Sequence, residues 1–69
     1  MDVEKSYSTE DVVAKLRRLA SALEAGKVFE ISIAGKRIRV PANAAIQFEY
    51  ECNDDDEEIE IELRWKRRK

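Results

Sequence analysis

The side chains that usually carry enzyme chemistry are scarce in this chain of 69 residues. The sequence contains no histidine, which removes the commonest general base and the commonest zinc ligand. Its one cysteine, Cys52, excludes an internal disulfide, a thiolate metal cluster and a Cys–His nucleophile pair. The two glycines, Gly26 and Gly35, are too far apart to build a phosphate-binding loop. We therefore expect no catalytic residue, no cofactor, no metal site and no enzymatic activity.

Carboxylates, by contrast, are plentiful, with 15 Asp and Glu residues against 13 Lys and Arg residues. Two carboxylates work as a catalytic pair when their surroundings separate their pKa values, and most of these carboxylates fall at positions expected to be exposed. A run of five acidic residues, Asp54–Glu58, lacks the central glycine and the terminal glutamate of an EF-hand loop. Four further glutamates alternate with apolar residues on either side of this run, and we expect them on one exposed face: Glu49, Glu51, Glu60 and Glu62.

Two interpretations of this acidic face remain open. The first is a solvated surface that resists edge-to-edge aggregation, which is favoured because runs of charge are usually just solvated. The second is a docking face for a basic protein segment or for divalent cations. Like charges that lie directly opposite across two strands are destabilising, so the clustering carries an energetic cost.

A second charged feature is the basic end of the chain. Residues 1–65 hold 9 basic and 15 acidic residues, and the last four residues are all basic. A basic surface on an acidic domain suggests contact with nucleic acid phosphates, although no exposed aromatic residues are interleaved to stack on bases. The residues of this alternative binding surface are Arg17, Arg18, Lys66, Arg67, Arg68 and Lys69. A disordered, solubilising tail is the favoured interpretation of Lys66–Lys69.

The elements that must position these charges begin with a helix. Ser8 is a good N-cap residue, and Gly26 fits a C-terminal cap. Apolar residues recur between them at helical spacing and form one stripe: Val12, Leu16, Leu19 and Leu23. The pattern predicts a helix over Thr9–Ala25.

After Gly26 the period of the apolar residues changes from 3.6 to 2, which predicts four amphipathic strands. Matching their apolar faces pairs Ile31 with Ile38 across a tight turn at Ala34-Gly35. It also pairs Val40 with Ile46, and Cys52 with Ile59. A slip of two residues in the last hairpin keeps the same faces, so its register stays open.

These elements predict an α+β fold with one N-terminal helix packed on one face of a four-stranded antiparallel β-meander. Residues 1–65 are expected to form a single domain, followed by the tail at 66–69. Whether Met1–Tyr7 adds a short strand is left open. We expect no membrane-spanning segment and no signal peptide, and a cytoplasmic protein that is a monomer or a weak dimer.

Four segments together resemble the amphi-Trp domain family, which is named for an amphipathic strand that ends in tryptophan. They are LRRLASALEAGKV, IRVP, FEYE and EIEIELRW, and the resemblance spans Tyr7 to Trp65. It implies a domain of unassigned function and assigns no role to any residue. The basic tail after Trp65 departs from the family pattern.

Taken together, the sequence favours a non-enzymatic protein-interaction or scaffolding module that acts through the acidic face or a sheet edge, with an unidentified and basic protein partner. The alternative is a small nucleic-acid-associated protein that uses the basic helix face and the basic tail.

Overall fold

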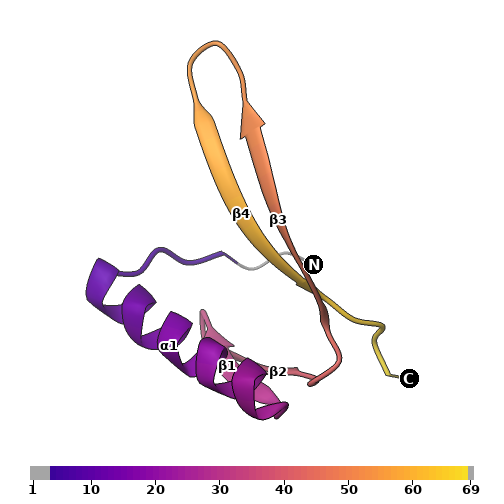
Figure 1. Ribbon diagram of the computed structural model, residues 1–69. Coiled ribbons are helices and arrows are strands. Elements are labelled where there is room, and N and C mark those ends of the chain that lie inside the picture. The colour runs from indigo at the N-terminus through magenta and orange to yellow at the C-terminus, as the bar shows by residue number, and fades with distance from the viewer. Residues whose placement is uncertain (1–3, 69) are drawn as a thin grey trace.

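The computed structural model describes residues 4–68, and Figure 1 shows that they form an α+β structure. Within this range lie one helix and four strands: α1 (Thr9–Ala25), β1 (Phe29–Ile33), β2 (Lys36–Val40), β3 (Ala45–Cys52) and β4 (Glu57–Arg64). The helix, its bounds and the four antiparallel strands are confirmed.

Local chemistry sets the ends of α1. The Ser8 side chain accepts a hydrogen bond from the backbone N–H of Asp11 at 3.2 Å, which satisfies one of the free donors of the first turn. Gly26 ends the helix in the left-handed region, with φ at 63°. Two backbone bonds close this end, from Gly26 N–H to the Leu23 carbonyl and from Lys27 N–H to the Ala22 carbonyl.

The hairpin β1–β2 has the predicted register, with Phe29 opposite Val40 and Ile31 opposite Ile38. Its two-residue turn holds Ala34 at φ 50° and Gly35 at φ 78°. Positive φ at both turn residues is the geometry that matches the twist of two-residue hairpins. The most buried side chains are the opposed pair Phe29 and Val40, so the small core lies on this hairpin.

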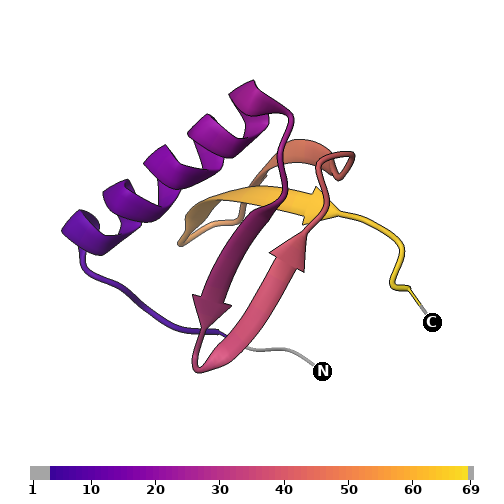
Figure 2. The same ribbon diagram turned by 90° about the horizontal axis from the view of Figure 1, so that it is seen from below.

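The helix packs along β1 (Figure 2). The Arg18 guanidinium donates a hydrogen bond to the backbone carbonyl of Glu30 and lies over the Phe29 ring, with its Cζ atom 5.4 Å from the ring centroid. Before the helix, the Tyr7 hydroxyl donates to the Ser32 carbonyl at 3.3 Å. The Lys15 ammonium lies 4.7 Å from the centroid of the Tyr7 ring. Arg18 therefore connects α1 directly to β1, and Tyr7, which lies against Lys15, connects the segment before the helix to β1.

The prediction of one continuous meander is wrong in one pairing. The described strands form two separate two-stranded sheets, β1–β2 and β3–β4, and Val40 does not pair with Ile46. Pro41 directly follows β2, and it has no N–H to donate to a strand ladder. The chain turns there, with Ala44 N–H bonded to the Pro41 carbonyl at 3.1 Å. As a result β3–β4 extends away from α1 and β1–β2 (Figure 1).

The register of β3–β4 is shifted by two residues from the pairing of Cys52 with Ile59. Cys52 lies opposite Glu57, Tyr50 opposite Ile59, and Phe48 opposite Ile61. The connecting loop sets this register, because the Asn53 side-chain oxygen accepts from the N–H groups of Asp55 and Asp56, each at 2.9 Å. Asn53 N–H also bonds to the Asp56 carbonyl. The loop therefore ends at Asp56, whereas pairing Cys52 with Ile59 would extend it to Glu58.

Both ends of the described chain lie outside the strands. Residues 4–8 form no strand, and positions 1–3 of the strand considered for Met1–Tyr7 lie outside the described residues. Residues 65–68 have no regular secondary structure, and Lys69 lies outside the described range. Within residues 4–68, no helix has both the length and the apolar character that crossing a membrane requires.

Candidate functional site

The β3–β4 hairpin gathers acidic side chains on one of its faces. Glu49 lies opposite Glu60, and Glu51 lies opposite Glu58. We call the glutamates on this face the acidic ladder: Glu49, Glu51, Glu58, Glu60 and Glu62. The four sequence-predicted residues are thus brought to one face, but their partners differ. Glu58 joins the ladder because the shorter loop extends β4 toward the tip.

Glu62 is the one member of the acidic ladder that the hairpin itself compensates. It lies opposite Gln47, whose side-chain amide donates to the Glu62 carboxylate at 3.1 Å. The Arg64 guanidinium is 3.6 Å from the same carboxylate oxygen. Glu62 therefore does not lie opposite another glutamate, and repulsion concentrates on the four glutamates nearer the tip.

Crowding of the acidic ladder alters the titration of its central residue. The pKa of Glu60 is raised above its ordinary value, first by a side-chain hydrogen bond with Glu58 and then by the negative charge of Glu58. Smaller contributions come from desolvation and from the charges of Glu49 and Glu51. Folding thus makes Glu60 easier to protonate.

Two groups of ladder carboxylates have oxygens close enough to share a cation. They are Glu49 with Glu60 and Glu62, and Glu51 with Glu58 and Glu60, and within each group the oxygens lie within 4.8 Å of one another. Hard cations such as Ca²⁺ accept such oxygen ligands but need six to eight of them. Each group offers only three carboxylates, half-buried or exposed, on an open ribbon, which is too few for such a cation, and we propose no metal site here.

The opposite face of the same hairpin is apolar. We call it the apolar hairpin face; it consists of three cross-strand pairs, Ile46 with Leu63, Phe48 with Ile61, and Tyr50 with Ile59. It is largely uncovered, with Phe48 76% exposed, Ile59 72% and Tyr50 60%. Cys52, near the tip on the same face, is also exposed. Sequence periodicity identified this face correctly but not its lack of cover.

Tyr50 also has a polar contact at the edge of the apolar hairpin face. Its hydroxyl donates to the Glu57 carboxylate at 2.8 Å, and the pKa of Tyr50 is raised, first because this hydrogen bond favours the protonated phenol. Cys52 and desolvation raise the pKa further. The contact ties the tip of β4 to β3.

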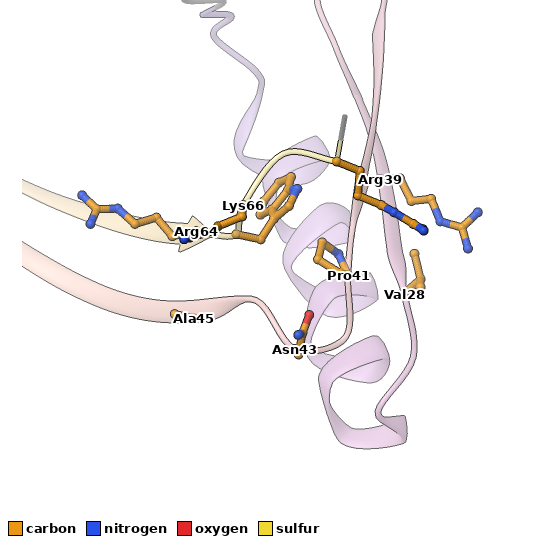
Figure 3. A pocket seen from close by; sticks show the side chains of 9 residues that line it. Val28, Arg39, Pro41, Asn43, Ala45, Arg64 and Lys66 are labelled. Carbon is orange, nitrogen blue, oxygen red and sulfur yellow. The ribbon is translucent and has the colours of Figure 1, made fainter.

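A basic pocket lies where the two sheets meet, and sequence reasoning did not identify it. It has a volume of about 650 Å³ and lies between the end of β4 and the segments around β1 and β2 (Figure 3). Its lining residues are Val28, Arg39, Pro41, Asn43, Ala45, Arg64, Trp65, Lys66 and Arg68. Trp65 thus lies beside the junction of the two sheets.

The basic residues predicted from sequence do not form one surface. Lys66 and Arg68 line the basic pocket, whereas Arg17 and Arg18 line a separate shallow depression beside Phe29. Arg18 is committed to the Glu30 carbonyl and the Phe29 ring, which gives it a structural role. No local spacing rule links Arg18 to an aromatic ring eleven positions later. Arg39 and Arg64 are the basic residues of the pocket that sequence reasoning missed.

The fold and these surfaces define a small α+β domain with an amphipathic β-hairpin, acidic on one face and apolar on the other. The family model of the Amphi-Trp domain matches residues 1–69, so the chain belongs to this family. Comparison with curated proteins and with solved structures gave no match.

Proposed function

We propose that this domain is a non-enzymatic protein-interaction module whose acidic ladder binds a basic segment of another protein. The observation that carries the proposal is the direct opposition of Glu49 to Glu60 and of Glu51 to Glu58. Like-charged cross-strand pairs weaken a sheet, and a basic ligand would relieve that repulsion. The raised pKa of Glu60 comes first from Glu58 on the same strand and to a smaller extent from the charges of Glu49 and Glu51, so it also reflects the crowding of carboxylates on this face.

The ladder suits an extended basic peptide in its shape as well as its charge. Its carboxylates lie on one face of β3 and β4. These two strands form an extended two-stranded ribbon (Figure 1). Arg and Lys side chains from a segment lying along this ribbon would meet successive glutamates, and arginine can bind a carboxylate through two parallel hydrogen bonds.

The second candidate function is nucleic-acid binding. The observation that favours it is the basic pocket, which brings Arg39 from β2 together with Lys66 and Arg68 from beyond β4. The acidic ladder on the same hairpin opposes this function, because it repels phosphates. Arg18 contributes less than expected, because its guanidinium is already engaged.

Titration with defined probes tests both candidates. A synthetic peptide rich in arginine and lysine is the first probe, an acidic peptide of equal length is its control, and a DNA duplex is the third. We expect the basic peptide to bind and the affinity to fall with salt. Binding of the duplex alone would overturn the first proposal and support the second.

Matched variants separate recognition by the ladder from general attraction to an acidic protein. The double variant Glu49→Gln, Glu60→Gln removes two ladder charges, and Asp54→Asn, Asp55→Asn removes two charges from the loop. The ladder variant is expected to lose most of its affinity for the basic peptide, while the loop variant keeps it. Equal losses in both variants would contradict recognition by the ladder.

A further inference from the structure

A single described chain leaves too much of its surface open for a domain of this size. Its accessible surface is 6438 Å², whereas a compact monomer of 8.0 kDa exposes about 4,500 Å². The radius of gyration is 13.6 Å, against about 11 Å for a compact chain of this length. The excess of roughly 2,000 Å² is of the size that an obligate dimer buries on each subunit.

The apolar hairpin face accounts for a large part of that excess. Taking about 200 Å² for the surface of one large apolar side chain, its exposed fractions correspond to roughly 600 Å². Two such faces reach the lower limit of a standard interface, about 1,200 Å² in total. The apolar stripe of α1 leaves further apolar surface exposed, at Leu16 and Leu23.

A two-stranded hairpin also needs cover to be stable in water. Isolated hairpins are marginal at best, and they persist when an apolar face packs on another layer. Among the described residues, neither α1 nor β1–β2 forms a packed layer over β3–β4. The cover must come from outside this arrangement of the chain.

The charges at the two ends of the hairpin indicate what covers the apolar hairpin face. The tip carries the acidic run Asp54–Glu58, and the opposite end is flanked by the cations of the basic pocket, Arg39, Lys66 and Arg68. A second hairpin laid antiparallel on the first places each acidic tip beside the basic pocket of the other copy. A parallel arrangement would place the two acidic tips together.

We propose that this chain is a two-fold homodimer in which the apolar hairpin faces pack antiparallel against each other and each acidic tip contacts the partner's basic pocket. The same patch is used on both copies, as a two-fold interface requires. The acidic ladder points away from this interface and stays open, so the dimer presents two ladders. The proposal is independent of what the ladder binds.

Sedimentation equilibrium of the full chain, over micromolar to millimolar concentration, measures the assembly. We expect a mass of twice 8.0 kDa. A lysine at position 48 faces the interface, whereas one at position 47 faces the ladder and meets Glu62. Phe48→Lys is expected to weaken the dimer by about tenfold or more, and its neighbour Gln47→Lys is the matched control. A monomeric wild-type chain, or equal dimerisation of both variants, would overturn the proposal.

Charge exchange tests the antiparallel orientation without altering the apolar hairpin face, so it remains informative if Phe48→Lys unfolds. Asp54→Lys with Asp55→Lys makes the tip basic, and Lys66→Glu with Arg68→Glu makes the other end acidic. Each double variant is expected to weaken self-association, and the chain carrying all four changes is expected to recover it. Failure of the fourfold variant to recover would refute the contact between tip and pocket.

Discussion

Arg18 offers the sharpest test of how the helix is held to the sheet. Replacing Arg18 with alanine removes the hydrogen bond to the Glu30 carbonyl and the contact with the Phe29 ring. The sequence pattern placed Arg18 on the polar side of the helix, where a substitution changes stability by less than about 0.5 kcal/mol. The structure predicts a larger effect, because both contacts bridge α1 and β1.

The two contacts set the size of the expected loss. A hydrogen bond from a charged donor contributes about 1.5–3 kcal/mol, and its exposure to water places this one at the lower end or below it. A cation over an aromatic ring at an exposed site adds roughly 0.5–1 kcal/mol. The two share one guanidinium and do not add fully, so we expect Arg18→Ala to cost about 1–2 kcal/mol.

Urea unfolding followed by far-UV circular dichroism measures this loss. Arg17→Ala is the matched control, since the neighbouring residue makes neither contact with β1. All variants must be compared at one protein concentration, because association would shift the midpoint. If Arg18→Ala and Arg17→Ala unfold at the same urea concentration, the polar bridge between α1 and β1 has no energetic importance.

Three further outcomes are expected. The free energy of unfolding should rise as the pH falls from about 7 toward the ordinary glutamate pKa of 4.5, because the folded state raises the pKa of Glu60 and binds its proton more tightly. Urea titrations across this range check the sign, and a steady decrease in the free energy of unfolding would contradict it. Gly26→Ala should cost roughly 1–2 kcal/mol, because alanine resists the left-handed φ of 63°, and thermal unfolding would detect the shift. Asn53→Ala should remove the two bonds that close the loop and let the register slip by two residues; cross-strand NMR contacts of Tyr50 would move from Ile59 to Ile61, and an unchanged partner would disprove control by the loop.

Local rules predicted the parts of the fold that local chemistry determines. Ser8 and Gly26 identified both ends of α1, because capping depends on residues within one turn. The parity of the apolar residues gave the faces of β1 and β2, and the tight two-residue turn at Ala34-Gly35 selected the register.

The pairing of β2 with β3 depends on how the chain leaves Pro41, and the strand pattern carries no such information. The register of β3–β4 could not be predicted, for a different reason. A slip of two residues leaves every side chain on its own face, so only the hydrogen bonds of Asn53 distinguish the two registers.

The candidate surfaces also divide into those that local rules predict and those that they do not. Alternation along β3 and β4 correctly placed Glu49 and Glu60 on one face, since strand geometry alone decides the face. The basic pocket joins Arg39 to Lys66 across two sheets, and no sequence spacing signals that juxtaposition. The role of Arg18 does not follow from the sequence, because an exposed position on the helix can still have partners far along the chain.

The separation of the strands into two hairpins has a consequence for how fast the chain folds. Every strand pairing among residues 4–68 joins strands that are neighbours in the sequence. Such contacts close short loops, and isolated hairpins and helices form in about 10 μs or less. Refolding should therefore begin with a fast phase that is independent of protein concentration. Covering the apolar hairpin face requires an encounter between two chains, so the rate of the last step should rise in proportion to concentration.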